Sequence, residues 1–180
     1  MHTTGYGSTD VGRKRERNED RLLVDTKRGL YAVADGMGGH EAGDLAATIA
    51  VDTVARVVKR YLAAADIGFD GIVGPDVLAF IVREAVRQAN REVHYAARTA
   101  KGAHGMGCTL TVLLVQGEIA ALAHVGDSRL YLMRDSRVRQ LSEDHTLVAD
   151  LVKVGAISKD QAKDHHCSHV ITRAVGTSSN

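Results

Sequence analysis

Carboxylate side chains stand beside short apolar segments at three separate places in this chain of 180 residues. Glu19 and Asp20 precede the first apolar segment, Asp35 ends the second, and Asp127 follows a later one. Hard divalent cations such as Mn²⁺ and Mg²⁺ bind several oxygen ligands, which proteins gather from separate segments. Together the three positions predict a metal site, and each of them alone has a simpler interpretation.

The segment Asp35–His40, with the sequence DGMGGH, is the most informative of the three. A carboxylate at the end of a strand can bind a hard cation, and Gly36 allows its backbone carbonyl to turn toward the same ion. An equally simple interpretation is a strand-to-helix turn in which Asp35 caps the following helix. A dinucleotide-binding loop fits less well, because Glu41 occupies the position of the third glycine in G-x-G-x-x-G.

A charged segment, Arg13–Asp20, contains the carboxylates that precede the first apolar segment. Its simplest interpretation is a solvated run of charges. The alternative is a site in which Glu19 and Asp20 hold metal while a nearby arginine binds phosphate, because guanidinium groups match the geometry of phosphate oxygens. Asp127, taken alone, is most simply a β-turn residue.

Five motifs in a fixed order resemble the bacterial branch of the PPM, or type 2C, metal-dependent protein phosphatases. They are Arg15-x-x-Asn18-Glu19-Asp20, Asp35–His40, Gly107-x-Thr109, Val125–Arg129, and Asp144–Leu147 leading to Val170–Gly176. The resemblance extends over nearly the whole chain, from about Gly5 to Gly176.

The resemblance implies a protein serine/threonine phosphatase with a β-sandwich flanked by long helices. Two Mn²⁺ or Mg²⁺ ions are expected in a cleft at one end of the sheets, where a metal-bridging water attacks phosphoserine or phosphothreonine. The resemblance implies that Asp35 bridges both ions and that the carbonyl of Gly36 binds one of them. Glu19 and Asp20 are expected to act directly or through coordinated waters.

Three further residues receive roles by the same resemblance. Arg15 is expected to clamp the phosphate, and Asp127 resembles the ligand of a third, weaker metal position. His40 resembles a general acid that protonates the leaving seryl or threonyl oxygen, which suits a group that titrates near neutrality. The alternative for His40 is a histidine at a helix start without a catalytic role.

The segment from His145 to Arg173 corresponds to a flap that borders the cleft and influences substrate choice in similar proteins. Here it departs from the family pattern, because the sequence DHHCSH stands at 164–169 where relatives commonly have a proline and an Arg-Asn pair. Three histidines and a cysteine can bind zinc, but their crowding lacks the spacing of a structural zinc site. A variable surface loop is the expected structure.

The elements that must position these residues follow from hydrophobic periodicity and from the turn residues. Strands are expected at 22–25 and 30–34, a long amphipathic helix at 41–65, and a second helix beginning at Pro75, the single proline of the chain. Further strands at 109–115, 119–125 and 130–133 are expected to form an antiparallel meander. The order predicts an α+β fold in which helices cover packed sheets.

Net charge, cysteine content and apolar runs indicate which kinds of partner and which compartment to expect. A net charge of +1 gives no strong field for nucleic acid or an anionic membrane, so neither is expected as a partner. The two cysteines, Cys108 and Cys167, form no disulfide framework, and the N-terminus lacks an apolar leader. With no apolar run long enough to span a membrane, a soluble protein in a reducing cytoplasm is expected.

The chain is expected to form one phosphatase domain over residues 1–180, incomplete at its C-terminus. The family pattern continues with a second Asp-Gly pair and a later Asp-Asn pair that complete a metal position, and neither is found before Asn180. Two functions therefore stay open: a phosphatase that acts on phosphoproteins and opposes a Ser/Thr kinase, or an inactive interaction module with the same fold.

Overall fold

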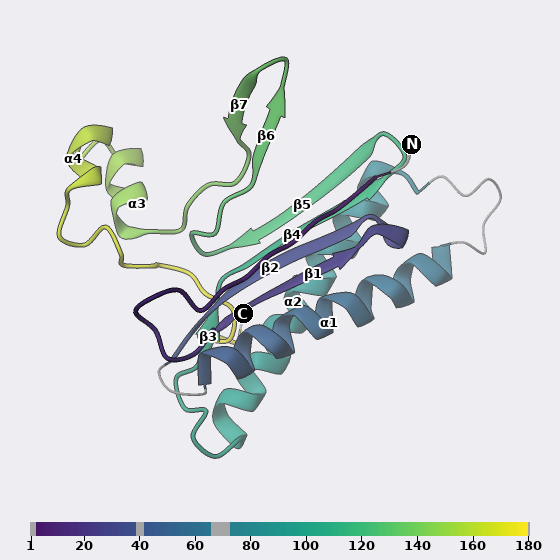
Figure 1. The fold of residues 1–180 in the computed structure, drawn as a ribbon, viewed down its shortest axis with the longest axis horizontal. Coiled ribbons are helices and arrows are strands. Elements are labelled where there is room, and N and C mark those ends of the chain that lie inside the picture. The colour runs from purple at the N-terminus through teal and green to yellow at the C-terminus, as the bar shows by residue number, and fades with distance from the viewer. Residues whose placement is uncertain (1–2, 39–41, 66–72, 180) are drawn as a thin grey trace.

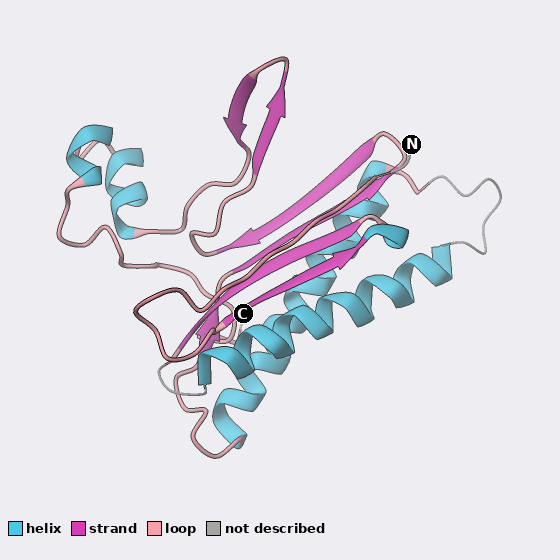
Figure 2. Ribbon diagram, viewed as in Figure 1, coloured by secondary structure: helices cyan, strands magenta, loops and turns pink. Residues whose placement is uncertain are grey.

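A computed structural model describes residues 3–38, 42–65 and 73–179. The strands are β1 (Asp20–Asp25), β2 (Leu30–Met37), β3 (Gly107–Cys108), β4 (Leu110–Gln116), β5 (Ile119–Val125), β6 (Tyr131–Arg134) and β7 (Arg137–Gln140). The helices are a 3-10 turn η1 (Thr26–Arg28), α1 (Ala42–Ala65), α2 (Pro75–Thr99), α3 (Leu147–Lys153) and α4 (Lys159–Lys163). The mixed helix-and-sheet fold that the sequence predicted is confirmed (Figures 1 and 2).

The main sheet runs in the order β1-β2-β4-β5, and β3 pairs with the end of β2. All of these pairs are antiparallel. Successive side chains of a strand point to opposite faces, so Leu30, Ala32 and Ala34 of β2 share one face, where all three are buried. The long helices α1 and α2 cover this face of the sheet (Figure 1).

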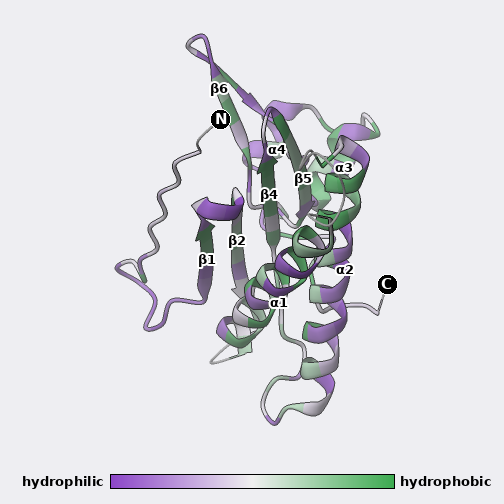
Figure 3. Ribbon diagram, turned by 90° about the vertical axis from the view of Figure 1, so that its right-hand side faces the viewer, coloured by the Kyte–Doolittle hydropathy of each residue, from purple (hydrophilic) through white to green (hydrophobic). Residues whose placement is uncertain are grey.

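Small residues allow α1 to lie close to the sheet and to α2. Ala46, Ala47 and Ala50 of α1 are fully buried, and Pro75 opens α2, where its missing N–H has no intrahelical partner to lose. Figure 3 shows strands β4 and β5 coloured hydrophobic, whereas α1 and α2 carry mixed colours along their length. This is the pattern of two amphipathic helices packed on an apolar sheet.

The start of α1 touches the end of β2 through two glycines. A Cβ atom at Gly36 would overlap the backbone carbonyl of Gly43, and the N–H of Gly36 donates to the carbonyl of Glu19 at 3.2 Å. The absence of a side chain at both positions therefore lets the helix begin directly beside the strand that carries Asp35.

We expect Gly36→Ala to lower the free energy of unfolding by about 1–3 kcal/mol, the usual cost of overpacking a buried site. The reason is that the added methyl has rigid backbone rather than a movable side chain in its way. Urea denaturation measures the effect. Gly74→Ala is the matched control, because a Cβ at Gly74 meets nothing within 4 Å; equal losses in the two variants would contradict the prediction.

The predicted meander is correct for β4 and β5 and wrong for the third strand. β6 pairs with β7 in a separate two-stranded sheet, joined by a turn in which Asp135 and Ser136 both have positive φ. Gly126, with φ of 106°, turns the chain away at the end of β5. This hairpin projects from the main sheet in Figure 1.

The last part of the chain returns to the main sheet after the two short helices. Thr146 caps α3 by accepting from the N–H of Ala149, and Ser158 and Gln161 form a capping box at α4. Val175 then bridges Cys108 of β3. Within the described ranges, no helix combines the length and the apolar character that crossing a membrane requires.

Candidate metal centre

Two predicted metal ligands face each other across the β1–β2 pair. Asp20 lies directly opposite Asp35 in the register of the two strands. Residues opposite each other in an antiparallel pair project from the same face, with Cβ atoms about 4.5–5.5 Å apart. The face is the one turned away from α1 and α2, because the helix-facing positions of β2 are the even-numbered ones. Both carboxylates line a cavity of about 220 Å³.

The electrostatics of Asp35 reflect this crowding of negative charge. Partial burial raises the pKa of Asp35 above its ordinary value of 3.8, and the adjacent carboxylate of Asp20 raises it further. Arg15 lowers the pKa of Asp35, and Asp127 adds a smaller increase. Oxygen donors that repel one another are suited to a hard divalent cation, which removes the repulsion. The residues present therefore fit Mn²⁺ or Mg²⁺.

A buried threonine fixes the backbone at Asp35. The hydroxyl of Thr109 accepts from the N–H of Asp35 at 3.0 Å, and the N–H of Thr109 donates to the carbonyl of Asp35 at 2.8 Å. The same hydroxyl lies 2.7 Å from the hydroxyl of Ser128. Asp35 is thus joined by hydrogen bonds to the loop that contains Asp127.

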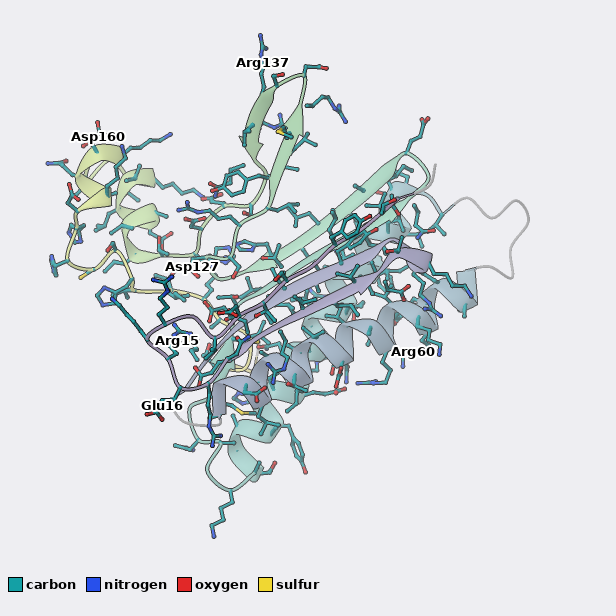
Figure 4. The ribbon with its side chains drawn as sticks, viewed as in Figure 1. Arg15, Glu16, Arg60, Asp127, Arg137 and Asp160 are labelled. Atoms are coloured by element: carbon teal, nitrogen blue, oxygen red, sulfur yellow. The ribbon has the colours of Figure 1, made fainter. Side chains whose placement is uncertain are left out.

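The loop that carries Asp127 is held from several sides. The N–H of Gly126 donates to Nδ1 of His145 at 3.1 Å, and the N–H of His145 donates to the carbonyl of Gly126 at 2.8 Å. A Cβ at Gly126 would lie 2.6 Å from a methyl carbon of Thr109, so the close packing requires glycine there. Arg15 and Asp127 lie at the same end of the sheet in Figure 4.

We expect Thr109→Val to weaken Mn²⁺ binding by about 10–100-fold, the usual cost of removing a partner that orients a metal ligand. The substitution keeps the shape of the side chain but deprives the N–H of Asp35 of its acceptor. Calorimetric titration with Mn²⁺ measures the change. Thr109→Ser keeps the hydroxyl and is the control; a valine variant that binds as tightly as the serine variant would argue against this role.

Glu19, Gly36 and His40 are the remaining predicted site residues of the first two motifs. The carboxyl group of Glu19 lies beside Gly43 at the start of α1, where a Cβ on Gly43 would be 2.9 Å from its carboxyl carbon. This is the favourable end of a helix for a negative charge. Gly36 follows Asp35 and is buried under the same turn of α1. His40 lies outside the described residues, so its role stays a prediction.

Sequence reasoning placed Thr109, Ser128 and His145 in motifs without giving any of them a function in the site. The motif Gly107-x-Thr109 was the available signal for the threonine. The cited hydrogen bonds of Ser128 and His145 each join residues that are 19 positions apart, and no local spacing encodes them.

Comparison with known families matches residues 10–167 to the model described as protein phosphatase 2C. Among curated proteins, the serine/threonine phosphatase stp of Listeria innocua is 35% identical over 171 residues, which cover 93% of this chain and 65% of that protein. The present chain therefore spans somewhat less than two thirds of the length of this relative.

Solved structures show the same similarity in three dimensions. The crystal structure of the Mycobacterium tuberculosis serine/threonine phosphatase PstP/Ppp superposes with a TM-score of 0.78 at 34% identity, covering 93% of this chain and 65% of that one. The catalytic domain of PstP in complex with two manganese ions gives a TM-score of 0.72 at 33% identity, covering 92% and 64%.

Proposed function

This chain belongs to the protein phosphatase 2C family, and we propose that it is a metal-dependent protein phosphatase that hydrolyses phosphoserine and phosphothreonine. Residues 1–180 are proposed to belong to one phosphatase domain that is incomplete at its C-terminus. The relatives that carry the name serine/threonine phosphatase support this activity, as does the PstP structure with two manganese ions.

The observation that carries the proposal is the direct pairing of Asp20 with Asp35 across two strands. Arg15 offsets part of the repulsion between these two carboxylates, but burial and Asp20 still leave the pKa of Asp35 above its ordinary value. Such a pair costs the folded state energy unless a cation binds it. The arrangement is therefore best explained as a site for divalent metal.

Each side chain has a proposed task in the reaction. When bound, a pair of Mn²⁺ or Mg²⁺ ions would supply an activated water and neutralise the phosphoryl charge. Asp20 and Asp35 provide carboxylate oxygens for the ions, and Asp127 provides one for a third, weaker position. Arg15 binds the phosphate oxygens of the substrate, a contact suited to its guanidinium group. Gly36, Glu19 and His40 keep the roles predicted from the family pattern.

Hydrolysis assays test the proposal. The purified chain would be given p-nitrophenyl phosphate and a phosphothreonine peptide, first with Mn²⁺ and then with a chelator. We expect hydrolysis of both substrates that the chelator abolishes and that added Mn²⁺ restores. A folded chain that binds Mn²⁺ by calorimetry and hydrolyses neither substrate would contradict the enzymatic proposal and favour an interaction module.

The proposed substrates are phosphoproteins, and a Ser/Thr kinase whose products this chain reverses is the proposed functional counterpart. A cytoplasmic location is proposed as well. Cys108 and Cys167 are both free thiols, and a reducing compartment keeps thiols in that state.

A further inference from the structure

A second group of side chains that can bind metal lies in the loop after α4. Its members are histidine and cysteine residues, unlike the carboxylates of the first site. His165, His166 and Cys167 each offer a ligand atom, and these atoms lie within 4.8 Å of one another. The imidazole rings of His165 and His166 are stacked, with centroids 4.4 Å apart. Cys167 is a free cysteine and half-buried. In the sequence analysis zinc was weighed here, and a variable surface loop was the expected structure.

The backbone of this loop is already folded into two successive turns. The N–H of Ser168 donates to the carbonyl of His165 at 2.9 Å, and the N–H of Val170 donates to the carbonyl of Cys167 at 3.0 Å. Val170 in turn accepts from the N–H of Leu147 at the start of α3. These hydrogen bonds hold the backbone of the loop, which lowers the entropic cost of binding an ion there.

Thiolate and imidazole donors select a different class of cation from the carboxylates. Sulfur and nitrogen ligands favour Zn²⁺ and related transition metals, whereas Mg²⁺ and Mn²⁺ favour oxygen. We propose that His165, His166 and Cys167 bind one Zn²⁺ ion, with the fourth position open to water. Binding releases the thiol proton of Cys167 to solvent and involves no oxidation.

One hydrogen bond indicates which nitrogen of His165 takes part. Nδ1 of His165 accepts from the backbone N–H of Cys167 at 3.2 Å, so its lone pair points into the turn that carries the thiol. Coordination through Nδ1 exchanges this single long hydrogen bond for a bond to metal. The stacked rings must also rotate apart, because both in-plane lone pairs have to point to the same ion. His166 is exposed, which leaves it room to rotate.

The other cysteine provides an internal control. Cys108 is fully buried in β3, and burial together with the charge of Asp35 raises the pKa of its thiol to about 12. Because Cys108 is fully buried and its thiol resists deprotonation, it is not available to an added metal ion. A signal that depends on metal-bound thiolate therefore reports Cys167 alone.

The test uses Co²⁺, a spectroscopic substitute for Zn²⁺, with the whole chain in excess Mg²⁺ to fill the carboxylate site. We expect one equivalent of Co²⁺ to produce a thiolate-to-cobalt charge-transfer band that Zn²⁺ then removes. The band should persist in Cys108→Ala and in Asp35→Asn, and it should be lost in Cys167→Ser. Replacing both histidines by glutamine should weaken Co²⁺ binding by about tenfold or more, at least the effect of losing an orienting partner.

Three results would overturn the proposal: no band at one equivalent of Co²⁺, a band that survives Cys167→Ser, or unchanged affinity after both histidines are replaced. Thermal melting of each variant excludes unfolding as the cause of a lost band. Because the band comes from sulfur, its presence or absence is independent of phosphatase activity. Failure of the phosphatase proposal and failure of the zinc proposal are therefore distinguishable.

Discussion

Asp35→Asn is expected to lower Mn²⁺-dependent hydrolysis of a phosphothreonine peptide by at least about a hundredfold. The charge on Asp35 is the proposed bridge between two cations, and metal ions contribute several kcal/mol of transition-state stabilisation, of which each 1.36 kcal/mol corresponds to a factor of about ten. Asparagine has nearly the same shape but carries no charge. Initial rates at saturating Mn²⁺ measure the loss.

Asp52→Asn is the matched control for this experiment. Asp52 is an exposed aspartate on α1, the helix that covers the opposite face of the sheet. The two substitutions change the same net charge and differ only in place. Activity of Asp35→Asn within about a factor of ten of the control would contradict a bridging role, because the loss would amount to less than about 1.4 kcal/mol.

The helices of this fold were the most predictable part, since each has a strong local signal. The periodic stripe from Glu41 to Ala65 corresponds to α1, which begins at Ala42, and Pro75 opens α2 as expected. Helical periodicity depends only on near neighbours along the chain. For this reason the end of α1 and the start of α2 followed from the sequence.

The third strand of the predicted meander shows where local signals fail. The apolar run Leu130–Met133 does form β6, but a run of this kind does not specify its partner. Its partner is β7, which consists of Arg137–Gln140 and is too polar to be recognised as a strand from its residues. The two strands are joined by the short turn at Asp135 and Ser136, both with positive φ, so β6 pairs with the segment that follows it in the chain.

The sequence could nominate members of the candidate metal centre but not its geometry. The acidic residues beside apolar runs, together with the family resemblance, named Asp20 and Asp35 as ligands. Their contact depends on the register of β1 with β2, and a shift of one residue would move one carboxylate to the helix-covered face. The turn η1, closed by Gly29 with φ of 60°, sets that register.

Without a bound cation, the ionised carboxyl group of Asp35 destabilises the folded chain. The pKa of Asp35 is raised in the folded chain above its ordinary value of 3.8. A carboxyl group with a raised folded-state pKa costs stability where it is ionised, and the cost disappears as pH falls through the raised value. In chelator, the contribution of Asp35 therefore makes the chain more stable as the pH is lowered toward that range.

The same reasoning predicts that metal reverses the order of stability of the parent chain and Asp35→Asn. In chelator at neutral pH, the variant should unfold at the higher temperature, because it lacks the repulsion with Asp20. In Mn²⁺ at about one hundred times the dissociation constant, the parent should gain about 2.7 kcal/mol. For a chain of this size that gain corresponds to a melting temperature roughly 5–10 °C higher. The variant has lost the bridging charge and should gain little.

Thermal unfolding in both buffers gives the four melting temperatures. If the parent chain were the more stable of the two in chelator as well, the proposed repulsion between Asp20 and Asp35 would be wrong.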